Sequence, residues 1–596
     1  MVFLAVLVVS FFLEACSGGP TGAANSTAAS LTPTFTSTPE TAASQGAAYT
    51  YQIETSPGSN VALALVTAPS GATLAGNTIT WTPSAAQSRA PNQFSLTAST
   101  AAGSASRSWS VTPAGTVSGS WIDTYWTSNG PVSVPFDWSK ALTLIPPRAL
   151  IPQPDGSFQT LQGKGKSDGT FSIPNVPGGY YWLAPAGSAY WTSGSTFDFG
   201  SNGNPPPNGL PDLANITNTF TLNFNGLDAL QSGDEVVFFW DSAPPFSLVA
   251  TAASPAGATS FSTTATINSN LDFSQSAPGF LLQYEPETFG TLSALMLGPE
   301  LTIPSLSFPG GTSTITLTQT LNPSPKASFD LNIEGSAWVQ LFSGAGPSSA
   351  TPERADLELT TQPFVTGANA LSTFGTSIAL LGDLQPLPAL FSAVCADSHP
   401  TAPNSFTAPP GEPPITTDQD FGPVQYEDPF PPAWPRVFTF CQTASVPVPI
   451  PGSTTPILFQ LVDTQISSVP QSPISPLTGQ VQNPTIDGMS LFVAESVSAT
   501  GVTLKWTAPS GVTPTGYRIT VFVAGALSNR VISYLPTSEF YTAKTSALLP
   551  LLQAGKTYVF LITAILDGGA NFETQPNRSA LPIAFVSIVS APITVN

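Results

Sequence analysis

Two acidic pairs have a spacing that could support chemistry. Glu285 and Glu287 share one face of a predicted strand in QYEPETFG, and Asp418 and Asp420 stand two residues apart in TTDQDFG. Paired carboxylates can hydrolyse a glycosidic bond, or supply some of the oxygens that Ca²⁺ needs. Solvated charges on an edge strand give the same pattern. We keep Asp418 and Asp420 as weak candidates for a structural Ca²⁺ site, expect no other cofactor and assign no catalytic residue.

Nucleophilic catalysis needs a base, and His399 is the single histidine of the sequence. It lies in DSHPTAP, a proline-flanked segment typical of a solvated loop. The sequence contains no Gly-rich phosphate loop, CxxC pair or HExxH motif. We therefore predict that the protein is not an enzyme, and a hydrolase with its site in residues 201–480 is the weakest alternative.

The first of the three cysteines, Cys16, follows an apolar run over residues 2–13. This run has the length of a signal-peptide core and falls short of the roughly 20 residues that cross a bilayer. Leu13-Glu-Ala-Cys16 resembles the lipobox of bacterial lipoproteins, although Glu14 replaces the usual small or apolar residue. The resemblance implies cleavage before Cys16 and a diacylglycerol on its thiol. An ordinary signal peptide with a chance cysteine is the alternative.

The other two cysteines, Cys395 and Cys441, are expected to pair, because an exported chain folds in an oxidising compartment. Their disulfide would close a loop of about 46 residues and contribute on the order of 3–4 kcal/mol. We predict that it holds residues 401–435, which are rich in proline, as a surface flap. Two free buried thiols are the alternative, and a zinc site lacks the histidines it would need.

Aromatic residues concentrate between Trp121 and Trp191, a stretch with five of the eleven tryptophans. The candidates for ligand contact are Tyr181, Trp182, Tyr190 and Trp191, since exposed rings can stack on a sugar or contact a protein. On a strand, Tyr180 and Trp182 share one face while Tyr181 and Leu183 share the other, so at least one of the two sets should be core. We favour core packing and keep a carbohydrate-binding protein that uses the aromatics of residues 121–191 as the alternative function.

The composition favours short strands. The sequence has 62 Pro and 48 Gly, which long helices do not tolerate and which suit strands joined by turns. Only 8% of its residues are charged, the formal net charge is −20, and no Lys/Arg cluster occurs, so nucleic acid is excluded as a partner. The predicted fold class is all-β: tandem β-sandwich modules that follow a signal peptide and a flexible tether.

The N-terminal part is predicted to comprise a lipoprotein signal peptide (residues 1–15), a small-residue tether (residues 16–44) and a first sandwich (residues 45–113). Within the sandwich, apolar residues alternate as in Tyr49, Tyr51 and Ile53. The motif APSGATLAGNTITWTP resembles the Ig-like and cadherin-like repeats of bacterial proteins. The resemblance implies that Trp81 fills the space between two sheets.

The next two regions differ in how well they can be assigned. Residues 114–200 contain SDGTFSIPNVPGGYYWLAP, which resembles the carboxypeptidase-regulatory, prealbumin-like sandwich with its turn at Asp168-Gly169. Residues 201–480 resemble no family that we recognise. Their period-two segments, such as DEVVFFWD and ASFDLNIEGSAWVQLF, read as strands and predict one or two further β-rich domains.

Residues 481–596 resemble a fibronectin type III module, on VTLKW (502–506), GYRITV (516–521) and LQAGKTY (552–558). The resemblance implies that Trp506 lies between two sheets and that Tyr517 and Ile519 point inward. It also makes Tyr558 the tyrosine corner, whose hydroxyl bonds the backbone upstream. The loop DGGANFETQPNRS carries no RGD-type tripeptide.

These features predict a non-enzymatic, lipid-anchored protein for binding, adhesion or scaffolding at the bacterial cell envelope. Ser17, rather than Asp, after the cysteine favours the outer membrane, and a secreted or periplasmic protein is the alternative. The expected partners are the membrane, through the N-terminal lipid, and a protein or glycan ligand that the sequence does not identify.

Overall fold

Nearly all regular structure in the chain is β-strand. The computed structural model describes residues 31–127, 130–141, 146–185, 188–200, 216–232, 234–240, 246–251, 256–269, 277–289, 292–307, 313–322, 326–361, 414–427, 436–467, 472–499, 501–526, 532–550, 552–578 and 580–596. They form two compact units, Met1–Pro113 and Ala114–Asn596. Within the described part, no helix has both the length and the apolar character required to cross a membrane. The all-β fold class is confirmed, whereas the signal peptide, Cys16, Cys395 and His399 lie outside the described residues.

The first unit is a two-sheet sandwich. Its elements are β1 (Thr34–Phe35), β2 (Tyr49–Gln52), β3 (Thr55–Ser56), β4 (Ala62–Thr67), β5 (Thr73–Ala75), β6 (Thr78–Trp81), the short 3₁₀ turn η1 (Ala85–Gln87), β7 (Asn92–Thr100) and β8 (Gly103–Val111). Sheets β2-β6-β5 and β4-β7-β8 enclose the core. Trp81 is buried there, with edge-to-face contacts to Tyr49 and Phe94 at 6.2 and 5.5 Å between ring centroids. The predicted position of Trp81 is confirmed.

The prediction of a flexible tether up to residue 44 was wrong from residue 31 onward. Strand β1 pairs with β3, and the hydroxyl of Thr100 donates to the carbonyl of Leu31. The guanidinium of Arg107 donates to the carbonyls of Phe35 and Ser37 and lies 4.9 Å from the centre of the Phe35 ring. Apolar Phe35 and the donors of Arg107 therefore fix a segment whose small residues alone predict disorder.

Arg107→Ala is expected to release residues 31–37 from the first sandwich. The substitution removes hydrogen bonds from a charged donor, so protease cleavage in this segment should be roughly tenfold faster, which corresponds to about 1.4 kcal/mol. Limited proteolysis followed by mass spectrometry measures the rate. Lys166→Ala, an exposed charge in the second unit, is the control. An unchanged rate would show that Arg107 does not hold the segment.

Residues 114–200 form a second sandwich. Its elements are β9 (Gly115–Ser120), β10 (Ile122–Thr127), β11 (Gly130–Pro135), α1 (Trp138–Ala141), β12 (Arg148–Pro152), β13 (Phe158–Gln162), β14 (Lys164–Gly165), β15 (Thr170–Val176), β16 (Tyr181–Ala184), β17 (Ala189–Thr192) and β18 (Thr196–Asp198). Sheet β14-β15-β9-β18 faces β13-β12-β16-β17 across a core that includes Val117, Ile173 and Leu183. Asp168 accepts from the amide and hydroxyl of Thr170, and Gly169 has a φ of +82°, which confirms the Asp-Gly turn. The prealbumin-like assignment stays a prediction.

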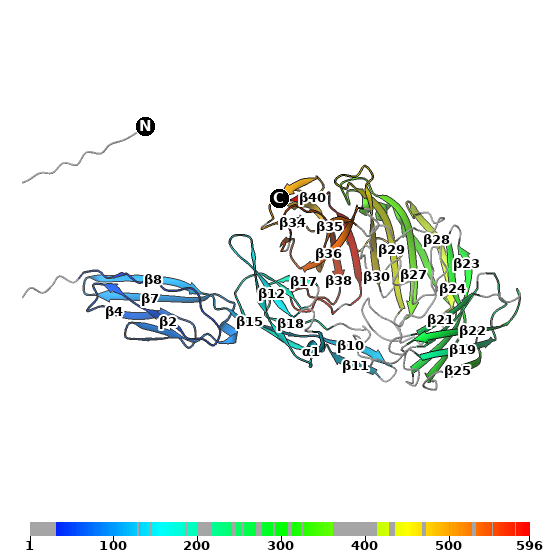
Figure 1. Ribbon diagram of the computed structural model, residues 1–596, viewed down its shortest axis with the longest axis horizontal. Coiled ribbons are helices and arrows are strands. Elements are labelled where there is room, and N and C mark those ends of the chain that lie inside the picture. The colour runs from blue at the N-terminus through cyan, green and yellow to red at the C-terminus, as the bar shows by residue number, and fades with distance from the viewer. Residues whose placement is uncertain are drawn as a thin grey trace, which may run out of the picture. The chain divides into compact units, whose positions relative to one another are not determined.

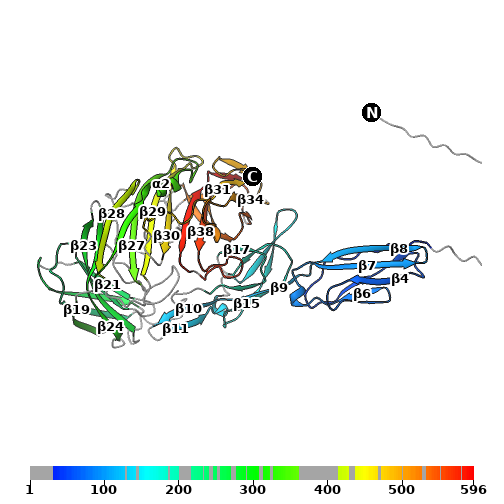
Figure 2. The same ribbon diagram turned by 180° about the vertical axis from the view of Figure 1, so that it is seen from behind.

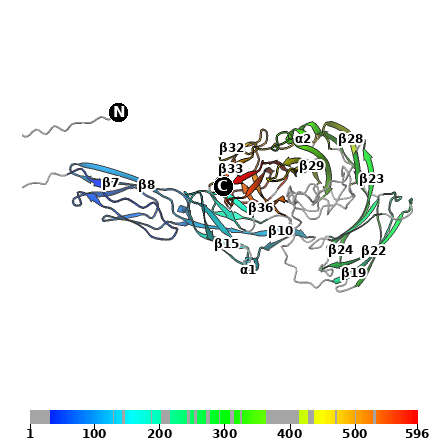
Figure 3. The ribbon, with the colours of Figure 1, turned by 45° about the horizontal axis from the view of Figure 1, so that its top comes forward.

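The middle region builds two more β layers around separate cores. Its elements are β19 (Ile216–Asn225), β20 (Glu235–Trp240), β21 (Phe246–Thr251), β22 (Ser260–Ser269), β23 (Ala277–Phe289), β24 (Leu292–Leu306), β25 (Ser313–Thr320), β26 (Lys326–Glu334), α2 (Gly335–Phe342), β27 (Thr351–Thr361), β28 (Asp418–Glu427), β29 (Arg436–Val448) and β30 (Ile457–Ser467). Strands β19 and β22 of one sheet and β23 and β24 of another lie in the same part of the molecule (Figure 3). The two sheets, β22-β19-β25 and β21-β20-β23-β24, share the core around Phe220 and Phe238. A second core, around Trp338 and Phe440, lies between the β26-β28 sheet, helix α2 and strands β27 and β29.

Two predictions in this region were wrong. The segment GSAWVQLF was predicted to continue a strand, but it forms helix α2. Trp338 and Phe342, four residues apart, bury one face of this helix. Asp418 accepts a hydrogen bond from the backbone N–H of Ser336 in its first turn. The predicted surface flap over residues 401–435 contains strand β28, which pairs with β26. Partners distant in the sequence decide both outcomes.

The C-terminal module is a sandwich of β31 (Gln482–Ile486), β32 (Met489–Ser490), β33 (Glu495–Val497), β34 (Thr503–Thr507), β35 (Gly516–Ala526), β36 (Ile532–Thr542), β37 (Ser546–Leu548), β38 (Thr557–Asp567), β39 (Ile583–Val589) and β40 (Ile593–Val595). Trp506 is buried with its ring centroid 5.1 Å from that of Tyr517. The hydroxyl of Tyr558 accepts a hydrogen bond from the amide of Gln553 at 2.9 Å. The predicted inter-sheet tryptophan and tyrosine corner are confirmed.

One 13-stranded sheet runs through three of the predicted modules, in the order β13-β12-β16-β17-β36-β35-β38-β39-β30-β29-β27 with β40 and β33 attached (Figures 1 and 2). Strand β17 pairs in parallel with β36, from Ala189↔Phe540 to Trp191↔Thr542. Strand β39 pairs with β30, from Thr464↔Phe585 to Ile466↔Ile583. The C-terminal module therefore occupies the middle of a sheet that its neighbours extend on both sides.

Candidate functional site

The aromatic candidates for ligand contact lie where β16 and β17 meet the C-terminal module. Tyr181 is 1% exposed, faces the core of its own sandwich, and its hydroxyl donates to the carbonyl of Gly194 at 2.9 Å. Trp182 points to the opposite face and is 0% exposed. Its ring lies 4.9 Å from that of Phe540, and its indole N–H donates to the carbonyl of Leu548 at 2.6 Å. Both faces of β16 are therefore covered.

Strand β17 is covered in the same way. Tyr190 is 7% exposed and stacks on Tyr541 at 5.2 Å between centroids, while Trp191 is half-buried, with its centroid 5.1 Å from that of Trp182. A sugar needs an open ring face, and Tyr181, Trp182 and Tyr190 offer none in this structure. The alternative of a sugar-stacking platform does not hold for these three rings, because the C-terminal module packs on the face of β16 and β17 that lies opposite the core of the second sandwich.

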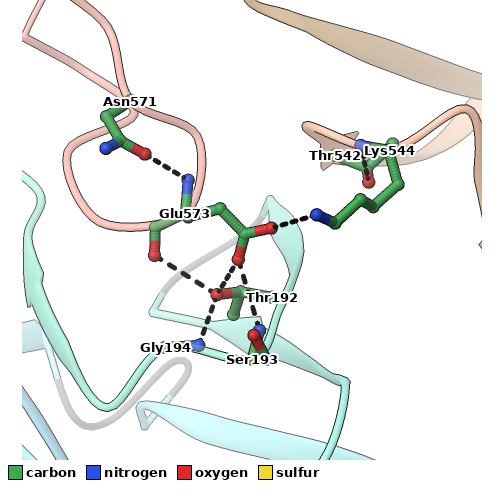
Figure 4. A network of polar contacts seen from close by, with 7 residues as sticks. All are labelled: Thr192, Ser193, Gly194, Thr542, Lys544, Asn571 and Glu573. Atoms are coloured by element: carbon green, nitrogen blue, oxygen red, sulfur yellow. Dashed lines mark hydrogen bonds and ion pairs between the residues drawn. The ribbon is translucent and has the colours of Figure 1, made fainter.

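A loop of the C-terminal module completes this junction. The β38–β39 loop (residues 568–582) carries Glu573, whose Oε2 accepts from the hydroxyl of Thr192 at 3.0 Å and from the amide of Ser193 at 3.3 Å (Figure 4). Its Oε1 lies 3.6 Å from Nζ of Lys544. The hydroxyl of Tyr180, followed by the charge of Glu573, raises the pKa of Lys544. The loop thus joins β17 to the end of β36.

A second ion pair fixes the far end of the same loop. Nε and Nη2 of Arg578 bind Oδ2 and Oδ1 of Asp198 at 3.0 and 3.2 Å, and Nη2 also donates to the carbonyl of Ile122. Asn577 donates to the carbonyl of Phe199 at 3.0 Å. A Cβ at Gly200 would collide with the backbone carbonyl of Ile122 and with Nη2 of Arg578, so glycine leaves room for this bidentate contact. This geometry holds the second sandwich and the C-terminal module together.

The loop is also held from within its own module. The carboxylate Oδ1 of Asp567 accepts from the amides of Gly569, Ala570 and Ala580 at 2.9, 3.1 and 2.9 Å. A loop that is already ordered loses less entropy when it docks on a neighbour. We infer that Asp567 presents Glu573 and Arg578 in position for their partners.

Comparisons with known proteins define the C-terminal module. Residues 488–579 match the fibronectin type III domain. This module is a fibronectin type III domain. No curated protein is similar to the sequence.

Several solved structures of immunoglobulin domains are similar to parts of the chain. The I67–I69 fragment of the titin I-band is 14% identical, over 48% of this chain and 99% of that chain, with a TM-score of 0.14. Sidekick-1 immunoglobulin domains 1–5 are 11% identical, over 94% and 98%, with a TM-score of 0.14. The N-terminal eight Ig domains of Down Syndrome Cell Adhesion Molecule isoform 1.30.30 are 9% identical, over 95% and 72%, with a TM-score of 0.13.

Arg578→Ala is expected to lower the free energy of unfolding of the 114–596 unit by about 2 kcal/mol, because it breaks a partly buried, bidentate ion pair between the fibronectin type III domain and the second sandwich. Arg578→Lys keeps the charge but not the fork of donors and should retain part of the stability. Urea denaturation of Arg578→Ala, Asp198→Asn and the double variant should give a coupling energy of about 1 kcal/mol. Additive effects would show that the two side chains do not act together.

The sequence motifs did not predict a role for Asp198, Lys544, Glu573 or Arg578. A signal was present, since charged residues make up only 8% of the chain and the loop NFETQPNR carries two of opposite sign. Nothing in the sequence pairs them with residues about 380 positions away, however.

The predicted acidic candidates have separate structural partners. Asp418 accepts from the hydroxyl and amide of Ser336, which lower its pKa, and Oδ1 of Asp420 accepts from the amide of Gly422. Oε1 of Glu285 accepts from the side-chain Nε2 of Gln283 at 2.9 Å, whereas the side chain of Glu287 lies outside the described part. Among the described residues, no three or more His, Cys, Asp or Glu gather in a metal-binding arrangement.

The predicted disulfide stays a prediction. Cys441 is fully buried on β29, opposite Asp356 of β27 and Thr464 of β30. Cys395 lies outside the described residues.

Proposed function

We propose that the chain is an exported, lipid-anchored, non-enzymatic scaffold of the bacterial cell envelope, whose second unit presents a binding or adhesive surface at a fixed geometry. Tandem Ig-like and fibronectin type III modules are typical of extracellular proteins for adhesion or scaffolding. What distinguishes this chain from a flexible string of such modules is the way in which its fibronectin type III domain is joined to its neighbours.

The observation that carries this proposal is the pairing of both sides of the domain's β36-β35-β38-β39 sheet. Strand β36 pairs with β17, and β39 pairs with β30. The core follows the sheet: Leu150, Trp182, Leu461 and Ile562 belong to one buried cluster. A module on a flexible linker keeps its strand edges and loops free, whereas here hydrogen bonds and apolar contacts oppose independent motion. A rigid unit suits a spacer or platform better than a catalyst that must open and close.

Expression of the full chain in a bacterial host tests the proposed export and lipid anchoring. Wild-type protein should partition with membranes and begin at a diacylglycerol-modified Cys16, measured by mass spectrometry of the mature N-terminus. Cys16→Ser should remain in the soluble exported fraction. An unmodified wild-type chain that begins at another residue would refute the anchor.

A glycan array with the intact protein tests the activity. The scaffold proposal expects no sugar binding that depends on Trp191, the one half-buried ring of the four candidates. Binding that is lost in Trp191→Ala would replace the scaffold proposal with the carbohydrate-binding alternative.

A further inference from the structure

Asp463 is a buried carboxylic acid at the point where the middle region meets the fibronectin type III domain. Its side chain on β30 is 0% exposed, and Oδ1 accepts from the backbone N–H of Ser587 on β39 at 2.9 Å. Its Oδ2 has no hydrogen-bond partner in the described part of the chain. Burial raises the pKa of Asp463 to about 8, so the acid carries its proton at neutral pH.

The hydrogen bond to Ser587 extends a short ladder. Strands β30 and β39 pair only from Ile466↔Ile583 to Thr464↔Phe585, and Ser587 lies two residues beyond Phe585. Its N–H points toward β30, where the side chain of Asp463 takes the place of a backbone acceptor. Without that acceptor, the N–H would be buried and unsatisfied.

A polar neighbour stands on the other side of Asp463. Gln442 of β29 is the residue opposite it in the strand register and is also fully buried. Its Nε2 donates to the carbonyl of Ile415 at 3.3 Å, and its Oε1 has no partner among the described residues. A protonated Asp463 could donate from Oδ2 to this oxygen and satisfy both atoms.

The described strands next to Asp463 in the sheet, β29 and β39, place no charged side chain beside it. Strands β30 and β39 contain no Asp, Glu, Lys, Arg or His other than Asp463 itself. Helix α2 and residues 472–481, which contribute to the cores on this side of the sheet, also contain none. Strand β29 has one charged residue, Arg436, at its first position. By register, Arg518 and Asp567 point to the opposite face. Ionised Asp463 would therefore be a buried charge without a counterion.

We propose that Asp463 is a proton-dependent latch between the fibronectin type III domain and the middle region. The protonated acid accepts from Ser587 and donates to Gln442, which holds β30 against β39. When the junction opens, water reaches the carboxyl group and the proton leaves near the ordinary pKa of about 4. Between about pH 4 and about pH 8, the closed form binds one proton more than the open form. The free energy that favours the closed form therefore decreases as the pH rises through this range, and it is nearly constant above it.

Hydrogen exchange of the full chain at several pH values between 5 and 8, corrected for intrinsic exchange, tests the latch. The opening constant of the β39 amides should rise with pH by up to about tenfold per unit in the wild type. In Asp463→Asn, the amide replaces the protonated carboxyl as donor and acceptor, so the variant should keep the junction closed and lose the pH dependence.

Strand β7 of the first sandwich is the internal control and should show no slope. A wild-type opening constant that is independent of pH over this range would overturn the latch, as would the same slope in Asp463→Asn. Should the variant fail to fold, the wild-type slope decides alone.

Discussion

Trp182→Ala is expected to lower the free energy of unfolding of the 114–596 unit by about 3–5 kcal/mol. The ring is fully buried between the second sandwich and the fibronectin type III domain, so truncation leaves a cavity in the core that they share. It also removes the donor to the carbonyl of Leu548. The loss of stability should extend to the strands of the fibronectin type III domain, because Trp182 contacts that domain directly. Its hydrogen bond to Leu548 joins two residues that are 366 positions apart in the sequence.

Urea denaturation of the full chain measures this effect. Trp182→Phe keeps most of the buried area but loses the N–H donor and should cost about 1–2 kcal/mol. Trp81→Ala, an equally buried tryptophan in the first unit, should destabilise only residues 31–113. A Trp182→Ala variant that leaves the fibronectin type III strands at wild-type stability would contradict a shared core.

Loss of the proposed Cys395–Cys441 disulfide is expected to cost about 3–4 kcal/mol, because the cross-link restricts a loop of about 46 residues in the unfolded chain. Cys395→Ser tests this without changing the buried position on β29. Wild-type protein in the presence of a reductant should match the variant. Peptide mapping without reduction should recover the two cysteines in one cross-linked species, whereas two free thiols would refute the bridge.

Short-range sequence patterns correctly predicted core positions and turns within individual modules. The alternation around Tyr49 and Tyr51, the turn at Asp168-Gly169 and the spacing from Trp506 to Tyr558 each depend on residues a short distance apart, and the structure places them as expected. In such stretches the strand period and the turn chemistry decide the outcome on their own.

Contacts between modules decided what the sequence could not predict. Alternation showed that one of the Tyr181 and Trp182 faces should be core, but not that a domain more than 300 residues later would cover the second face. The helix at α2 depends on a cap from Asp418, and the order of residues 31–37 depends on Arg107. The loop that carries Arg578 stands out by its two opposite charges, but nothing in the sequence pairs Arg578 with Asp198, which lies 380 positions earlier.

Calorimetry of the full wild-type chain tests the central claim, that the fibronectin type III domain is a fixed part of one rigid unit. We expect two unfolding transitions, one for residues 31–113 that shifts in Trp81→Ala and one for residues 114–596 that shifts as a whole in Trp182→Ala. A separate transition for the fibronectin type III domain, insensitive to Trp182→Ala, would contradict it.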